Sequence, residues 1–221
     1  MAGCAPLGCP GGQTYLARRI DIGDDTHAAA WGSIKDAPIE LPRHYIEIGG
    51  SLVQRTLRTL KDGDAFAVFD NYGDIGVIGT EPEGLYFNDT RFLSWYELRF
   101  EGKRPLLLSS VVQDDNAALS VNLANPDVHA DGVISLPRDT IAIERTKFLW
   151  QAICYERIGF RNYADSTSRF RIDIGFGADF RDLFEIRGTP RDRRGTSTSV
   201  VTGNGAGFRY EGLDNVKRRT E

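Results

Sequence analysis

The segment Arg-Phe-Arg-Ile-Asp-Ile-Gly-Phe, residues 169–176, decides the fold class because apolar side chains stand at every second position along it. Successive side chains of a strand point to opposite faces, so this period of two predicts a β-strand with one buried face. The buried face takes Phe170, Ile172, Ile174 and Phe176. We expect the charged residues of this and a neighbouring segment to face solvent or a partner: Arg169, Arg171, Asp173, Glu144 and Arg145.

A similar strand-like pattern begins at Leu52 and continues toward the end of the chain. Short segments rich in Val, Ile, Phe, Tyr and Leu alternate with turn clusters, which is typical of strands. Strands are expected at residues 65–69, 95–100, 106–112, 118–123, 140–147 and 152–162. One hairpin is expected to join 95–100 to 106–112, and another to join 208–210 to 215–219. Eight or more strands at this spacing predict an all-β fold, an antiparallel β-sandwich.

Helix signals are scarce and predict one or two short helices at most. Residues 88–93 fit a single helical turn. Residues 179–186 fit a short helix, because Phe180, Leu183 and Phe184 would then share a face. The stretch after Gly188 is rich in Pro, Gly, Ser and Thr and is expected to form a loop.

Composition favours one β domain preceded by a head. The chain has 221 residues, 41% of them hydrophobic. Residues 1–50 are weakly patterned and are expected to form a mobile, poorly ordered head, with Tyr45, Ile46 and Ile48 as an extended arm. The domain then covers residues 51–221 and is expected to be truncated at its C-terminal end, because the last residues look like an unfinished strand. The start lacks the features of a secretory signal, which predicts a cytoplasmic protein.

Charge and cysteine content exclude several partners. The chain has 27 basic and 31 acidic residues, so the net charge of -4 predicts no nucleic-acid partner and no anionic membrane surface. No apolar run is long enough to span a membrane. The cysteines Cys4, Cys9 and Cys154 are odd in number and form no disulfide framework. The spacing of Cys and His predicts no metal site, and no cofactor is expected.

Two segments carry most of the candidate chemistry. In the first, Asp89, Thr90 and Arg91 are flanked by aromatic residues. Asp and Arg side chains can hydrogen-bond to sugar hydroxyls, and a ring such as that of Tyr86 can stack on a sugar face. The alternative is structural: Asp89 caps a helical turn, or it pairs with Arg91 within a loop.

The second segment contains three acids, Asp179, Asp182 and Glu185. Paired carboxylates serve glycosidases as acid and base or nucleophile, but they must stand on opposite sides of the substrate. Neighbours on one helix face point the same way, so caps and salt bridges are the favoured interpretation. A basic cluster follows that suits a solvated loop or the surface of a partner domain: Arg187, Arg191, Arg193 and Arg194.

Taken together, the segments resemble the N-terminal domain of glycogen debranching enzymes of the amylo-alpha-1,6-glucosidase type. The resemblance covers about residues 50 to 221 and depends on the order and spacing of several motifs. They are Leu60–Asp64, Gly84–Tyr86, Asp89–Ser94, Pro105–Ser110, Asn125–Asp127, Leu136–Arg138, Tyr155–Arg157, Arg161–Tyr163 and Ala178–Gly188.

This resemblance implies a large, supersandwich-like domain that precedes a helical (α/α) barrel. In such proteins the barrel carries the catalytic carboxylates, and the sandwich packs against it in cis or in trans. The resemblance also implies an α-glucan as ligand. It places Asp89–Arg91 and Asp179–Arg187 near the junction of the two domains, as candidates for substrate binding or for the domain interface.

Three functional hypotheses follow. The first is a non-catalytic domain that supports the barrel of a glycoside hydrolase and helps to shape its α-glucan site. The second is a free-standing α-glucan-binding module that uses Tyr86, Trp95 or Trp150 as stacking platforms. The third is a self-sufficient hydrolase that uses Asp179, Asp182 or Glu185, for which the chain offers no opposed pair of acids.

Overall fold

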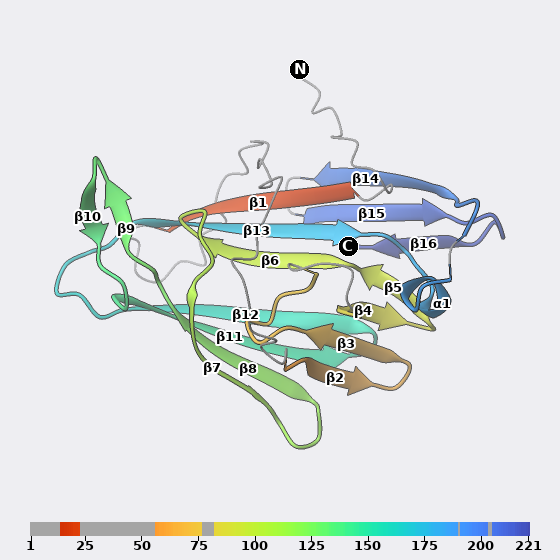
Figure 1. Ribbon diagram of the computed structural model, residues 1–221, viewed down its shortest axis with the longest axis horizontal. Coiled ribbons are helices and arrows are strands. Elements are labelled where there is room, and N and C mark those ends of the chain that lie inside the picture. The colour runs from red at the N-terminus through yellow and green to blue at the C-terminus, as the bar shows by residue number, and fades with distance from the viewer. Residues whose placement is uncertain (1–13, 23–55, 77–81, 190, 203–204) are drawn as a thin grey trace.

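The structure consists almost entirely of antiparallel strands, which confirms the predicted all-β fold class (Figure 1). It is a computed structural model that describes residues 14–22, 56–76, 82–189, 191–202 and 205–221, the first of these ranges as backbone only. The described residues form 16 strands and one helix. No helix among them is both long and apolar enough to cross a membrane.

The β11 sheet is the regular face of the sandwich and has the strand order β12-β11-β8-β7. Its strands are β7 (Leu106–Val112), β8 (Ala118–Ala124), β11 (Ile141–Trp150) and β12 (Ile153–Asn162). Side chains of β11 alternate between buried and partly or fully exposed positions along the whole strand. Gln151 and Ala152 both have positive φ and form the two-residue turn between β11 and β12. Such a turn matches the right-handed twist of the two strands it joins.

Three other sheets build the rest of the domain (Figure 1). The β13 sheet contains β1 (Thr14–Ile22), β13 (Phe170–Ala178) and β6 (Trp95–Phe100). The β3 sheet contains β2 (Arg58–Asp62), β3 (Ala65–Phe69), β4 (Gly84–Phe87) and β5 (Thr90–Leu93). The β15 sheet contains β14 (Thr196–Thr202), β15 (Gly205–Glu211) and β16 (Lys217–Thr220).

Two small elements lie at opposite ends of the long axis of the molecule (Figure 1). One is the hairpin of β9 (Val128–Ala130) and β10 (Val133–Leu136). The other is the single helix, α1 (Leu183–Ile186), which lies beside β4 and β5.

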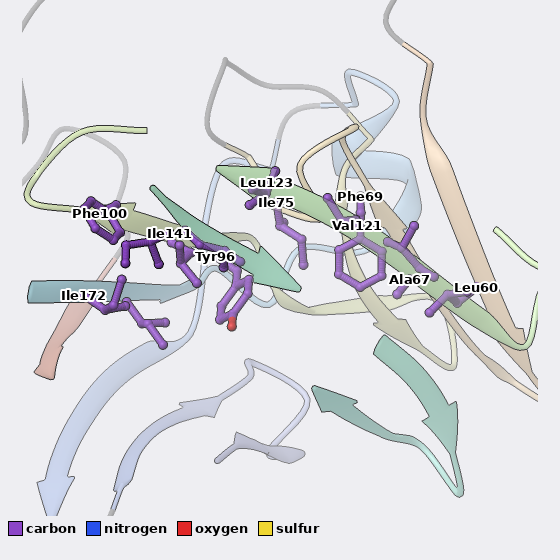
Figure 2. Packing of buried hydrophobic residues seen from close by; sticks show 14 of the residues in the cluster. Leu60, Ala67, Phe69, Ile75, Tyr96, Phe100, Val121, Leu123, Ile141 and Ile172 are labelled. Atoms are coloured by element: carbon purple, nitrogen blue, oxygen red, sulfur yellow. The ribbon is translucent and has the colours of Figure 1, made fainter. Parts of the chain in front are cut away.

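One hydrophobic core joins the β11, β13 and β3 sheets. Figure 2 shows side chains from all three sheets in one continuous cluster. Its members include Leu60, Phe69, Tyr96, Leu98, Phe100, Val121, Leu123, Ile141, Ile143 and Ile172. β8 and β11 therefore bury alternate side chains against this interior, as their sequences predict. β13 was predicted to have one buried face, but residues on both of its faces are buried.

The predicted hairpin of β6 and β7 is wrong, although both strands exist. β6 pairs with β13, and β7 pairs with β8 in another sheet. Phe100 and Lys103 close a tight turn through reciprocal backbone hydrogen bonds of 2.8 and 2.9 Å, after which the chain crosses to the opposite layer. The alternation of a strand fixes which side chains are buried, but it does not fix the partner strand.

The structure also differs from two local predictions, one for the stretch after Gly188 and one for the head. The stretch expected to be a loop contains β14, while the hairpin of β15 and β16 is confirmed. Within the predicted head, Thr14–Ile22 forms β1 and pairs along its length with β13. This strand was missed because its own pattern is weak, whereas the ladder hydrogen bonds to β13 are independent of side-chain type. Tyr45, Ile46, Ile48, Cys4 and Cys9 lie outside the described residues.

A matched pair of substitutions tests the core. Leu98 is fully buried, so Leu98→Ala is expected to lower the free energy of unfolding by about 2–5 kcal/mol through lost burial and a residual cavity. Leu108 is 62% exposed, so Leu108→Ala should change it by less than about 0.5 kcal/mol. Urea unfolding measures both, and equal effects would contradict the described core.

Candidate functional site

The two candidate segments come together at one corner of the domain. The Arg91 N–H donates to the carbonyl of Arg181 at 2.8 Å, and the Leu183 N–H donates to the carbonyl of Asp89 at 3.0 Å. These bonds join the β4–β5 hairpin to the residues that lead into α1. Figure 1 shows α1 beside β4 and β5. We call this region the α1 corner and define it as residues 84–91 and 179–187.

A buried ion pair lies beneath the α1 corner. Nε of Arg91 donates to Oδ1 of Asp179 at 3.1 Å, and Nη2 of Arg91 binds the second oxygen of the same carboxylate. Nη1 of Arg91 donates to the carbonyl of Glu83 at 3.1 Å. Burial alone would lower the pKa of Arg91, but the Asp179 carboxylate raises it overall. Asp179 therefore neutralises a buried guanidinium.

The local sequence explains how Arg91 reaches this position. Asn88 and Asp89 both have positive φ and form a two-residue turn between β4 and β5. Asn and Asp tolerate this conformation, so the helical turn expected over residues 88–93 is wrong and a hairpin forms instead. Gly84 gives room for the side chain, because a Cβ there would lie only 2.5 Å from Cδ of Arg91.

The other two acids hold the single helical turn. Asp182 is the N-cap and accepts from the Glu185 N–H at 2.8 Å, while the Glu185 carboxylate accepts from the Asp182 N–H at 3.1 Å. Burial would raise the pKa of Asp182, but the Glu185 N–H and the Arg191 guanidinium, 2.6 Å away, lower it overall. This reciprocal arrangement is a capping box, so the structural interpretation of the acids is confirmed.

The helix is shorter than the sequence predicts because Phe180 interrupts it. Phe180 has a positive φ of 50° and cannot belong to a right-handed helix. Its ring is buried and contacts the rings of Phe92 and Tyr210. The helix therefore begins only after Asp182, and Phe184 is left exposed on it.

The three rings proposed as stacking platforms have different environments. Tyr86 is buried, stacks on Phe66 at 4.5 Å and donates its hydroxyl to the Pro82 carbonyl, so its proposed role in sugar stacking is wrong. Trp95 is half-buried and covers Gly175, where a Cβ would lie 2.1 Å from the ring. Trp150 is the exposed ring of the three.

The outer surface of the α1 corner combines apolar and polar side chains on a fixed backbone. Phe87, Asp89, Phe184 and Arg187 are exposed, whereas Thr90 and Arg91 are buried below them. The surface can contact a partner or ligand, but Asp179, Asp182 and Glu185 are engaged within the domain. In the described part of the chain, no group of three or more His, Cys, Asp or Glu side chains is arranged to hold a metal ion.

A second buried network lies inside the sandwich and was missed from the sequence. Arg145 was expected outside, yet its side chain is fully buried. Nη1 of Arg145 donates to Asp74 at 2.6 Å, and Nε donates to Glu156 at 2.7 Å. Lys147 contacts the other oxygen of Glu156 at 2.6 Å, and the Tyr96 hydroxyl donates to that oxygen. Asp173 was also expected outside and is buried.

The signal for this network was present in the alternation of β11. Arg145 and Lys147 share the period-two face of Ile141 and Ile143, which places them inside. Glu156 is the register partner of Lys147 on β12. Burial alone would raise the pKa of Glu156, but Lys147 and Arg145 lower it to about 2.

Comparison with known proteins assigns most of the described domain to a family. The family model for the N-terminal domain of some glycogen debranching enzymes matches residues 60–221. The chain belongs to this family. No curated protein and no solved structure matches it. The matched region includes the α1 corner and the buried Arg145 network of this debranching-enzyme domain.

The first prediction for the debranching-enzyme domain concerns the buried pair of the α1 corner. Arg91→Met leaves the Asp179 carboxylate buried without its partner and should lower the free energy of unfolding by about 3–5 kcal/mol. Adding Asp179→Leu should recover part of this loss, because no buried charge remains. Asp214→Asn, in the exposed pair with Arg218, is the control and should leave the stability nearly unchanged, because solvent screens an exposed pair. Additive losses in urea unfolding of the double variant would contradict the assigned pair.

The second prediction concerns pH. The pKa of Glu156 is about 2 in the folded domain against an ordinary value of 4.5, so the unfolded chain takes up this proton first as the pH falls. The stabilising contribution of Glu156 is complete above pH 4.5 and is lost as the pH falls toward about 2, by a few kcal/mol at most. Glu156→Gln should remove this part of the pH dependence and lower stability at neutral pH.

Glu144→Gln, on the exposed face of the same sheet, is the matched control for this measurement. Burial raises the pKa of Asp74, so the contribution of Asp74 to stability increases as the pH falls, opposite to that of Glu156. The parent and both variants share this contribution. Unfolding curves at a series of pH values provide the comparison. If Glu156→Gln and the parent lose stability in parallel between pH 4.5 and 2, the assigned role of Glu156 is wrong.

Proposed function

We propose that this chain is a non-catalytic domain that supports an (α/α)-barrel catalytic domain and helps to shape its α-glucan site. Membership of the debranching-enzyme family supports a catalytic partner domain. One observation supports the non-catalytic role. The three acids of the second candidate segment, Asp179, Asp182 and Glu185, are all used within the domain as an ion-pair partner and as helix caps.

The α1 corner is the proposed contact with the barrel. Its backbone is held by the capping box, by the Arg91–Asp179 pair and by two hydrogen bonds to the β4–β5 turn. On this fixed base the ring of Phe184 is 63% exposed. An exposed aromatic side chain on a rigid element suits an interface, because ordering it on binding costs little entropy. Asp89 and Arg187 add polar contacts at its edge.

The alternative is a free-standing α-glucan-binding module. The observation that favours it is the exposed ring of Trp150, which belongs to the β11 sheet and not to the α1 corner. For either role we propose a cytoplasmic location, and the free thiol of Cys154 is compatible with a reducing compartment.

A substitution at Phe184 tests the proposed interface in an enzyme that contains this domain together with its catalytic domain. Phe184→Asp places a charge in the apolar contact and should reduce glucose release from branched dextrin at least tenfold, or about 1.4 kcal/mol, while the isolated domain keeps its stability. The matched control is Val133→Asp, because Val133 is 69% exposed on the β9–β10 hairpin at the opposite end of the molecule (Figure 1).

Two results would count against the proposal. One is equal activity of the Phe184→Asp and Val133→Asp enzymes. The other is release of glucose from branched dextrin by the 221-residue chain alone, abolished by Asp179→Asn or Glu185→Gln, which would show that these acids are catalytic.

A further inference from the structure

The outer face of the β11 sheet carries a cluster of three aromatic side chains and one isoleucine beside the β11–β12 turn. Its members, which we call the ring cluster, are Phe148, Trp150, Ile153 and Tyr155. Phe148, Trp150 and Ile153 are 43%, 56% and 51% exposed, and Tyr155 is half-buried among them. A contiguous apolar patch on a sheet face with polar surroundings marks a binding surface.

The rings of this cluster are fixed before any ligand arrives. Phe148 and Tyr155 are direct cross-strand partners, and their rings stack with centroids 4.9 Å apart. The Trp150 ring lies 6.4 Å from that of Tyr155 at an angle of 40°. The turn between the strands is held by the Gln151 N–H, which donates to Asp62 at 2.8 Å.

The inner face of the same two strands strengthens this arrangement. Lys147 and Glu156, the chain neighbours of Phe148 and Tyr155, form a buried ion pair of 2.6 Å on the opposite side of the sheet. A slip of one residue in these strands would expose the charges of Lys147 and Glu156 and bury the rings. The buried pair therefore fixes the register of the rings. Preorganised aromatic side chains lose little entropy when they bind a ligand.

Polar side chains continue the same face beyond the rings. Thr146 and Arg157 are register partners and come directly after the Phe148–Tyr155 pair, and Glu144 follows on β11. All three are exposed. The face therefore offers flat apolar surface next to hydrogen-bond donors and acceptors. A pyranose has the matching chemistry, with C–H groups on its faces and hydroxyls around its rim.

The size of the cluster argues against a protein partner. Aromatic residues bury roughly 150–250 Å² each, so half-exposed side chains of this number offer on the order of 400 Å². A stable protein interface needs about 800 Å² on each partner. The net charge of -4 gives no attraction for nucleic acid.

We propose that the ring cluster is a surface binding site for a linear α-glucan chain, with the sugar stacked on Trp150 and its hydroxyls directed toward Thr146 and Arg157. The assignment of an α-glucan rests on the proposed function, since the rings alone indicate only a sugar. The site is separate from the α1 corner, because none of its residues belongs to that corner.

Calorimetric titration of the 221-residue chain with maltoheptaose tests this proposal. The expected dissociation constant is in the millimolar range, as suits one exposed stacking site. Trp150→Ala and Tyr155→Ala should each weaken binding about tenfold. Tyr163→Ala is the matched control, because Tyr163 is 64% exposed just beyond the far end of β12 and should bind maltoheptaose like the parent.

Three results would overturn the proposal. They are the absence of binding to the parent, unchanged binding by Trp150→Ala, and equal binding of a cello-oligosaccharide of the same length. Self-association of the parent that Trp150→Ala abolishes, without sugar binding, would instead assign the cluster to a second copy of the chain. The Phe184 experiment measures activity of the two-domain enzyme, so a failed titration leaves its result, and the proposed function, intact.

Discussion

The contact between Arg145, Asp74 and Glu156 is the constraint on which the arrangement of the sandwich depends. A guanidinium in an apolar interior is strongly unfavourable unless carboxylates compensate it. Here one carboxylate comes from the loop after β3 and the other from β12, and the Tyr96 hydroxyl on β6 joins the same group. Residues from two sheets and from the loop after β3 must therefore meet at one point. Because a displaced strand would leave a buried charge unpaired, we infer that the network selects one arrangement of the layers over its apolar alternatives.

The α1 corner repeats this principle at the edge of the domain. Arg91 and Asp179 are 88 residues apart in the chain, and their pairing fixes the β4–β5 hairpin against the residues that precede the helix. The acids that resemble catalytic groups in the sequence, Asp179, Asp182 and Glu185, form the ion pair and the helix caps of this corner. In this domain of the debranching-enzyme family, these three acids hold the backbone in place. This use of the acids agrees with the supporting role that we propose for the domain.

Rigidity also links the interior to the two proposed contact surfaces. Each surface is exposed on the outside of an element that buried charges hold from the inside: Phe184 above the Arg91–Asp179 pair, and the rings of β11 and β12 above the Lys147–Glu156 pair. A long, flexible glucan loses conformational freedom when it binds, and a surface that is already ordered adds no further cost of its own. The buried ion pairs therefore connect the stability of the fold with the binding that we propose for these surfaces.

The sequence by itself determined the all-β class, the faces of most strands, the hairpin of β15 and β16, the capping interpretation of Asp182 and the family, because these follow from local period, turn chemistry and motif order. Period two puts Arg145 on the inner face, but its charge led us to expect it outside, and that expectation was wrong. Only the tertiary structure decided that β6 pairs with β13 and not with β7, that Arg91 pairs with Asp179, and that Tyr86 is buried while Trp150 is exposed. Alternation along a strand tells which side chains share a face, but the neighbour across the ladder and the layer that covers a face are contacts between distant parts of the chain, and no local pattern encodes them.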